Sequence, residues 1–207
     1  IGSDTGGSIR FPSASCGLVG LKPTYGRVSL HGAFPLANSL DHLGPMTRCV
    51  EDAARVLCVM AGYDSQDPNS IDAPVPNYLQ ALCSADAGDM PLAGKRIGVD
   101  WSYVSDGVEP SVADVTRRAL RQLADLGAQV IEVEVPSSAK VLAEAWGITC
   151  GVECARAHAD LFPAEQDQYG PVLRGLIELG LRTNPKDYDA LQALRGSFGA
   201  QLDQVLG

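Results

Sequence analysis

The sequence predicts an α/β protein, and two observations point to this class. Residues 95–99 and 128–134 are short apolar runs typical of strands, and a helical apolar pattern over 110–126 lies between them. This β-α-β order favours two neighbouring parallel strands joined by a crossover. A hydrophobic content of 45% over 207 residues is also enough to bury a sizeable core.

The first third of the chain predicts few regular elements. Residues 16–21 predict a buried strand, and residues 40–47 a second extended stretch. Apolar residues at helical spacing predict a helix over 49–61, with Gly62 beyond its end. Residues 63–94 are rich in Pro, Asp, Asn and Ser, so we expect a long connection with one short helix near 76–84.

The rest of the chain is predicted to be mainly helical. The helix over 110–126 has Pro110 in its first turn and Gly127 after its end, as helix termini favour. Three more amphipathic helices are predicted, the last with Asp187 and Asp189 near its start. These three helices cover residues 139–160, 171–182 and 186–206.

Charge and cysteine usage exclude several classes of protein. The chain has 16 Lys and Arg against 25 Asp and Glu, a net charge of −9, which argues against a nucleic-acid surface and against binding to anionic membranes. It has no apolar run long enough to span a membrane and no signal peptide, so we expect a cytoplasmic location. The six cysteines include no C-x-x-C pair, and H-E-x-x-H does not occur, so we expect no metal site and no cofactor.

A glycine-rich loop opens the chain with the sequence GSDTGGSIRFP. Ser8 follows two glycines, so one loop could supply an attacking hydroxyl and the N–H groups that hold an oxyanion. A phosphate-binding P-loop is disfavoured because Ser8 and Ile9, not Lys and Ser or Thr, follow Gly7. A G-x-S-x-G nucleophile elbow is disfavoured because Arg10 replaces its last glycine. A glycine turn with an ordinary surface serine stays open.

Four sequence blocks in the same order make the catalytic interpretation more specific. The chain resembles the second half of the signature region of the amidase signature family, closely over about residues 1–65 and more loosely through 95–99 and beyond. The blocks are residues 2–12, 16–29, 39–48 and 50–54.

The resemblance implies a Ser–Ser–Lys mechanism. Ser8 matches the nucleophile, and the backbone N–H groups of Thr5, Gly6, Gly7 and Ser8 match the oxyanion hole. In the family, a serine held by a cis peptide bond passes the proton to a neutral lysine. Both of those residues precede the nucleophile loop in the family and are not among the residues of this sequence, so we expect the isolated chain to be inactive.

Charged residues around the nucleophile allow two interpretations. Asp4 and Arg10 flank the serine, and we expect them to brace the loop, although contact with substrate is the alternative. We expect His31, His42 and His158 to be structural, because no suitable acidic partner is evident and Asp41, next to His42, would point elsewhere. Lys22 is expected to be structural, and Lys95, Lys140 and Lys186 to lie on the surface.

The family fold is a mixed β-sheet flanked by helices on both faces, and members extend beyond this sequence at both ends. We therefore expect residues 1–207 to be part of a single amidase domain, with a signature core over 1–65 and peripheral strands and helices over 66–207 near the substrate cleft. Such a partial fold should be poorly stable or completed by another chain, and a homodimer is one such arrangement. Trp146, Phe162 and Tyr169 are candidates for the cleft, or for packing beside it.

The expected reaction converts a small-molecule carboxamide to a carboxylate and ammonia through an acyl-serine. One alternative is the glutaminase subunit of the aspartyl/glutamyl-tRNA amidotransferase, which uses the same loop but usually has Gln where this chain has His42. A catalytically inert fragment that serves as a binding module is a third interpretation.

Overall fold

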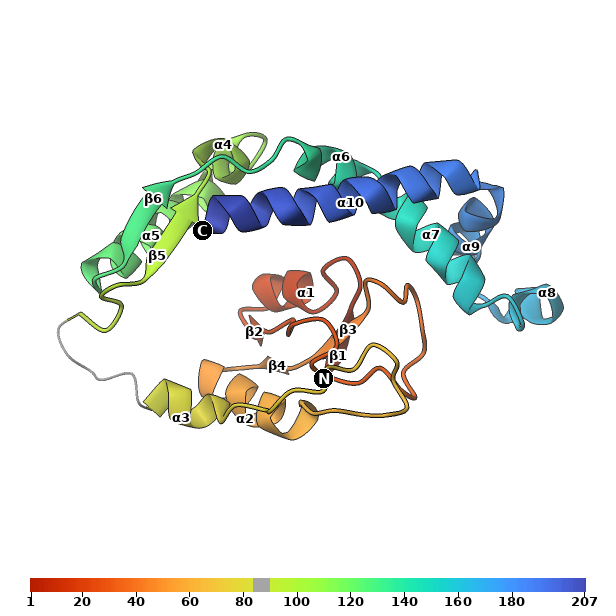
Figure 1. The fold of residues 1–207 in the computed structure, drawn as a ribbon, viewed down its shortest axis with the longest axis horizontal. Helices are drawn as coiled ribbons and strands as arrows, with labels where there is room; N and C mark the ends of the chain where they lie inside the picture. Colours follow the sequence, from red (N-terminus) through yellow and green to blue (C-terminus); the bar gives the residue numbers. More distant parts are fainter. Residues whose placement is uncertain (84–89) are drawn as a thin grey trace. The chain divides into compact units, whose positions relative to one another are not determined.

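The computed structural model describes residues 1–83 and 90–207 (Figure 1). The chain divides into two compact units. The first unit comprises Ile1–Cys83 and Glu144–Leu191, and the second comprises Ser84–Ala143 and Gln192–Gly207. The division expected from the sequence, with a signature core over 1–65 and a periphery over 66–207, stays a prediction.

Two short antiparallel strand pairs organise the start of the first unit. Strand β1 (Gly2–Asp4) pairs with β3 (His42–Gly44), so that Asp4 lies opposite His42. Strand β2 (Val19–Gly20) pairs with β4 (Met46–Thr47). Of the buried strand expected over 16–21, only Val19–Gly20 is a strand, and it is half-buried rather than buried. The extended stretch expected over 40–47 contains β3 and β4, whereas β1 was not expected. Because β1 ends at Asp4, the glycine loop begins at the edge of this strand pair.

Three helices accompany these strands. Helix α1 (Arg10–Ser15) follows the glycine loop, α2 (Val50–Met60) confirms the helix predicted over 49–61, and α3 (Tyr78–Cys83) confirms the short helix near 76–84. Helix α2 is amphipathic and buries Ala53, Ala54 and Leu57. Helix α1 was not predicted, because its sequence RFPSAS has no apolar periodicity.

The apolar core of the first unit lies among its later helices, which are α7 (Trp146–Ala157), α8 (Phe162–Glu165) and α9 (Pro171–Arg182), with a 3-10 turn over Gln166–Gln168. Cys154, Ala155, Phe162 and Ile177 form a buried cluster. Leu36, Tyr169, Leu173 and Leu176 pack against it. Phe162 and Tyr169, which were candidates for the cleft, therefore take part in packing.

The second unit contains the predicted β-α-β segment (Figure 1). Strand β5 (Arg96–Val99) pairs in parallel with β6 (Gln129–Glu132), which places Ile97 opposite Val130. Helix α5 (Pro110–Asp125) connects the two strands, begins at Pro110 and precedes Gly127, whose φ of 99° favours glycine. The strands, the helix and their parallel pairing are confirmed.

The remaining helices differ in part from expectation. The single helix predicted over 139–160 is wrong: α6 (Ser138–Glu144) ends where Ala145, with ψ near 3°, interrupts the helix, and α7 begins at Trp146. The predictions over 171–182 and 186–206 are confirmed by α9 and by α10 (Pro185–Leu206), which contributes residues to both units. Helices α4 (Trp101–Ser105) and α8 are too short for a periodic pattern to reveal.

The part of the chain that the structure describes contains no candidate membrane span and no candidate metal site. No helix of residues 1–83 and 90–207 is both long and apolar enough to cross a membrane. Within the same residues, no group of three or more His, Cys, Asp or Glu side chains could hold a metal ion. Five cysteines are free thiols, and the side chain of Cys83 lies outside the described residues. The five are Cys16, Cys49, Cys58, Cys150 and Cys154.

Candidate active site

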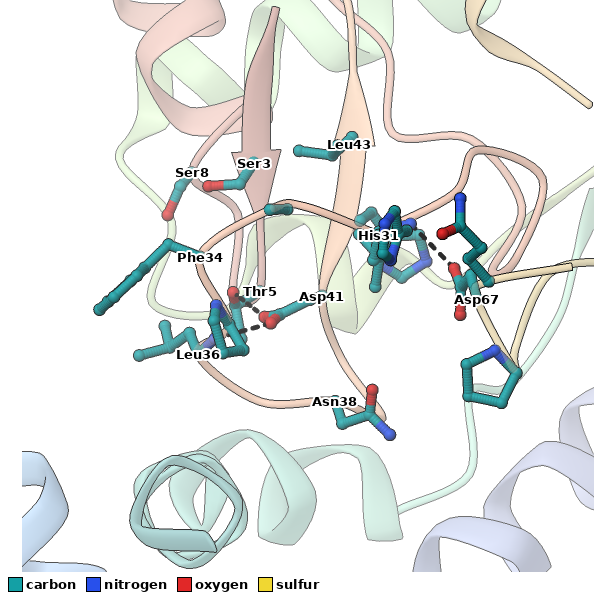
Figure 2. Close-up of a pocket in the computed structure, with 16 residues that line it drawn as sticks. Ser3, Thr5, Ser8, His31, Phe34, Leu36, Asn38, Asp41, Leu43 and Asp67 are labelled. Carbon is teal, nitrogen blue, oxygen red and sulfur yellow. Dashed lines mark hydrogen bonds between the residues drawn. The ribbon is translucent and has the colours of Figure 1, made fainter. Parts of the chain in front are cut away.

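Ser8 lies on the turn between β1 and α1 and is exposed. It borders a cavity of about 230 Å³ within the first unit (Figure 2). The lining combines apolar side chains with hydroxyl, imidazole and carboxylate groups. The apolar lining includes Leu30, Ala33, Phe34, Pro35, Leu36 and Leu43, and the polar lining includes Ser3, Thr5, Ser8, His31, Asp41 and His42.

Asp4 is the centre of the loop that carries Ser8. Its side chain is only 1% exposed and accepts hydrogen bonds from the backbone N–H groups of Gly7 (2.8 Å), Ile9 (3.2 Å) and Arg10 (3.4 Å). Burial alone would raise the pKa of Asp4, but the Arg10 side chain and the N–H of Ile9 outweigh burial and hold this pKa at about 2. The loop is thus wrapped around a carboxylate that stays ionised.

Arg10, at the C-terminal end of this loop, binds back to Asp4. Its guanidinium donates from Nε to Oδ2 of Asp4 at 3.0 Å and from a terminal nitrogen to Oδ1 at 2.9 Å, a two-pronged ion pair. The hydrogen bond to Asp4 raises the pKa of Arg10. Both side chains are therefore engaged with the loop itself, the geometry expected of bracing residues.

Gly6 and Gly7 are each covered by an aromatic ring. A Cβ on Gly6 would lie 2.8 Å from the Trp146 ring, and a Cβ on Gly7 would meet the Phe11 ring at a φ of 129°. Trp146 also donates from Nε1 to the carbonyl oxygen of Thr5 at 3.4 Å. Trp146, a candidate for the cleft, thus packs against the nucleophile loop. The N–H of Gly7 is taken by Asp4, so this group would have to leave Asp4 before it could hold a substrate oxyanion.

Asp41 joins the loop that carries Ser8 to the cavity wall. Oδ1 of this buried side chain accepts from the hydroxyl of Thr5 at 2.5 Å, and Oδ2 accepts from the N–H groups of Leu36 (2.8 Å) and Ala37 (3.0 Å) (Figure 2). The sequence indicated that Asp41 would point away from His42 but did not indicate these partners. The sequence feature that could have indicated a buried, hydrogen-bonded Asp41 is its place in a short stretch flanked by Leu40 and Leu43.

Glu153 anchors the same segment from helix α7. Its side chain is 6% exposed and accepts from both the N–H (2.8 Å) and the hydroxyl (2.6 Å) of Ser39. The hydroxyl of Tyr188 donates to the same carboxylate at 3.1 Å. Burial raises the pKa of Tyr188, and Glu153 raises it further. Residues 36–41 are therefore held at two points by buried carboxylates.

His42 and Lys22 form a pair beside the cavity. Nδ1 of His42 lies 2.6 Å from the carbonyl oxygen of Leu40, which can only accept, so Nδ1 carries the proton. Nε2 must then accept from the Lys22 ammonium at 3.0 Å. Burial lowers the pKa of both side chains. A neutral imidazole whose free lone pair is taken by Lys22 is poorly placed to act as a base toward Ser8.

The other histidines and lysines have different surroundings. His158 is 1% exposed, donates from Nε2 to the carbonyl of Pro35 (2.9 Å) and accepts from the hydroxyl of Tyr169 (3.0 Å) at Nδ1, so both ring nitrogens serve packing. His31 lies exposed at the cavity rim. The remaining lysines are exposed, as expected from the sequence, and they are Lys95, Lys140 and Lys186.

Comparison with known proteins extends the resemblance over most of the chain. Residues 1–177 match the model of the family described as Amidase. The chain is 43% identical over 195 residues to a protein of Pseudomonas putida named amidase, covering 94% of the chain and 40% of that protein. It is also 40% identical over 191 residues to a glutamyl-tRNA(Gln) amidotransferase subunit of Akkermansia muciniphila, covering 91% of the chain and 38% of that protein.

A solved structure supports the same fold. A bacterial aryl acylamidase described as one of the amidase signature enzymes superposes with a TM-score of 0.75 at 27% identity, over 99% of this chain and 43% of that chain. The α/β fold class is thereby confirmed, and the parallel and antiparallel strand pairs described above are parts of it. The chain spans about two fifths of the length of these relatives.

Proposed function

Because the chain belongs to the amidase family, we propose that it carries the nucleophile of an enzyme that hydrolyses the C–N bond of a carboxamide. The observation that carries the proposal is the placement of Ser8, which lies exposed beside a cavity on a loop held by Asp4 and Arg10. A preorganised loop of this kind is what acyl transfer requires, since the nucleophile and the N–H donors must keep fixed positions during the reaction.

We propose two chemical steps. The oxygen of Ser8 bonds to the carbonyl carbon, the C–N bond breaks, and ammonia leaves with the proton that Ser8 gave up. Water then attacks the acyl-serine and releases the carboxylate. The family resemblance assigns the proton transfer to a cis-bonded serine and a lysine that precede these residues in the family. The described residues near Ser8 support that assignment, because the pair of His42 and Lys22 is already hydrogen-bonded.

The oxyanion would be held by backbone N–H groups of Thr5, Gly6 and Ser8, with Gly7 contributing once its N–H leaves Asp4. Because Gly6 and Gly7 have no Cβ, the rings of Trp146 and Phe11 can pack directly on the loop backbone and help to hold it. Loss of one such donor typically costs about 100- to 1,000-fold in rate.

The substrate proposed for the cavity is a small uncharged amide. Its apolar lining residues suit a hydrocarbon or aromatic acyl group, and the lining also includes polar groups such as Ser3 and Thr5. No cofactor is required for the proposed steps. We also propose that residues 1–65 form the signature core, that the enzyme works in the cytoplasm, and that it is a homodimer.

A second candidate is the glutaminase subunit of a tRNA-dependent amidotransferase. Its support is the 40% identity to the amidotransferase subunit of Akkermansia muciniphila. That activity would hydrolyse glutamine and pass ammonia to a partner subunit, whereas an amidase would release ammonia from other amides without a partner.

The test measures ammonia release by the full-length protein from a series of aliphatic and aromatic amides and from glutamine. We expect Ser8→Ala to abolish turnover, and Ser15→Ala, which removes an exposed hydroxyl at the end of helix α1, to retain it. Turnover of glutamine alone would favour the second candidate. Near-normal activity of a folded Ser8→Ala protein would overturn the nucleophile assignment. A folded original protein that turns over none of these amides would favour an inert family member.

A further inference from the structure

Asp41 binds Thr5, the first residue of the proposed oxyanion hole. Its Oδ1 accepts from the Thr5 hydroxyl at 2.5 Å, the shortest hydrogen bond of this carboxylate. We propose that Asp41 is a positioning residue, which fixes Thr5 and through it the N–H groups beside Ser8 during acyl transfer. The inference rests on the proposed function.

The two carboxylate oxygens of Asp41 accept hydrogen bonds from two different segments of the chain. Oδ1 faces Thr5, and Oδ2 takes two consecutive backbone N–H groups, those of Leu36 and Ala37 (Figure 2). Leu36 lines the cavity, so one carboxylate connects the nucleophile loop to a second segment of the cavity lining. Because Asp41 is only 8% exposed, water competes weakly for these three donors.

The Thr5 side chain is suited to transmit this constraint to the backbone. The hydroxyl is carried on Cβ, directly beside the backbone, so fixing it sets χ1 and restricts the backbone of residue 5. On the other side, the carbonyl oxygen of Thr5 accepts from Trp146 at 3.4 Å. Thr5 is thus held from its side chain and from its main chain, next to the two glycines that have no side chain to hold.

The segment that carries Asp41 is itself anchored. Glu153 binds Ser39 through both its N–H (2.8 Å) and its hydroxyl (2.6 Å), two positions before Asp41. The N–H of Asp41 donates to the carbonyl of Ala37 at 2.8 Å, which closes a tight turn. A carboxylate on a segment fixed in this way can define the position of Thr5, rather than follow it.

Asp41 is not placed as a base for Ser8. Both of its oxygens are already occupied by donors from Thr5, Leu36 and Ala37. Its effect on the reaction must therefore pass through Thr5. A misplacement of about 1 Å in such a site can cost about 100-fold in rate, so loss of this hydrogen bond should be visible in turnover.

The experiment is a double-mutant cycle on Thr5 and Asp41 in the full-length protein, measuring kcat and KM for one hydrolysed amide. Thr5→Val keeps the shape of the side chain and removes only the hydroxyl. We expect Thr5→Val and Asp41→Ala each to lower kcat at least about tenfold with KM changed less than about threefold. The double variant should be no slower than the slower single variant, because both remove the same interaction.

Conservative variants separate positioning from general support of the fold. In Asp41→Asn, the amide oxygen can still accept from Leu36 and Ala37, and the amide nitrogen can donate to the Thr5 hydroxyl, which also accepts. Thr5→Ser keeps a hydroxyl. We expect both variants to retain kcat within about threefold of the original protein. Affinity for a boronic acid that forms a tetrahedral adduct with Ser8 should fall in Thr5→Val and be kept in Thr5→Ser.

The outcomes distinguish this inference from the proposed function. If Ser8→Ala is inactive while Thr5→Val keeps full kcat and boronate affinity, the positioning role is wrong and the nucleophile assignment stands. If Ser8→Ala is active, the proposed function itself is wrong. If Asp41→Ala fails to fold, Thr5→Val decides alone, because it creates no unpaired backbone group.

Discussion

The two units of the chain are stabilised in different ways. In the first, irregular backbone is organised by buried carboxylates: Asp4 binds the loop that carries Ser8, Asp41 binds the cavity wall, and Glu153 binds Ser39. In the second, β5, α5 and β6 follow from apolar patterns, and the carboxylate of Asp100 caps helix α4 at a half-exposed position. A site built from loops depends on buried polar contacts for precision, whereas a β-α-β unit depends mainly on the burial of its apolar faces.

Asp4 and Asp100 make this contrast specific. The pKa of each is lowered to about 2. For Asp100 the largest cause is the hydroxyl of Ser102, followed by the N–H groups of Val135 and Tyr103, and the contacts with Ser102 and Tyr103 are exposed. For Asp4 the hydrogen bonds must first overcome burial, and they hold the loop that carries Ser8. The same direction of pKa shift therefore marks a structural centre in one unit and a surface cap in the other.

The largest predicted effect is the loss of the Asp4 carboxylate. Asp4→Ala leaves the N–H groups of Gly7 and Ile9 without their acceptor and Arg10 without its partner, so we expect a loss of about 2–4 kcal/mol in the free energy of unfolding. Denaturant titration of the full-length protein measures it. Asp100→Ala is the matched control and should lower stability much less. Equal losses would show that the proposed contrast between the units is wrong.

Glu153 should have the next largest effect. Glu153→Ala removes the carboxylate that accepts from the N–H of Ser39 and from the hydroxyl of Tyr188. We therefore expect the free energy of unfolding to fall by about 1–3 kcal/mol. Glu153→Gln can still accept from Ser39 and should retain most of the stability. Thermal melting compares the two variants. If the Ala variant melts like the Gln variant, the contact with Ser39 contributes little.

A substitution at Gly6 tests how closely the Trp146 ring packs on the loop. In Gly6→Ala the new Cβ would lie 2.8 Å from the Trp146 ring, so we expect a loss of about 1–2 kcal/mol together with reduced turnover. Gly175→Ala, in helix α9, meets nothing within 4 Å and should stabilise the protein by about 0.5–1 kcal/mol. Unchanged stability and turnover of Gly6→Ala would show that Trp146 moves aside freely.

A further predicted effect, no larger than that of Gly6→Ala, is on the pH dependence of stability. The folded-state pKa of Asp4, about 2, lies below its ordinary value of 3.8, so its contribution is complete above pH 4 and is lost as the pH falls toward 2. Between pH 4 and pH 2, we expect the free energy of unfolding to fall by about 1–2 kcal/mol less in Asp4→Ala than in the original protein. Asp100→Ala should reduce this fall less, because water screens the exposed groups around Asp100. The reverse order would contradict the account.

Sequence patterns predicted the elements that depend on neighbouring residues. Helices α2, α5, α9 and α10 and the parallel strands β5 and β6 follow from local periodicity, since each buries one face of a regular element. Helix α1 was missed because its sequence has no apolar stripe, and α6 and α7 were joined because nothing in the pattern marks the interruption at Ala145.

The site was predicted less completely than the fold. The loop of Ser8 was found because its glycines and charges are adjacent in sequence. Asp41 and Glu153 were missed because their partners lie 36 and 114 positions away, at Thr5 and Ser39, and no local pattern encodes such pairs. The bracing geometry of Asp4 and Arg10 was accessible from sequence, because all of its contacts fall within six positions.

The most direct test of the central claim is labelling of the full-length protein with a serine-directed fluorophosphonate, with the modified peptide mapped by mass spectrometry. The account predicts a single modified peptide containing Ser8, lost in Ser8→Ala and kept in Ser15→Ala. A folded protein that takes no label at Ser8, or is labelled equally in Ser8→Ala, would show that this loop does not carry an activated nucleophile.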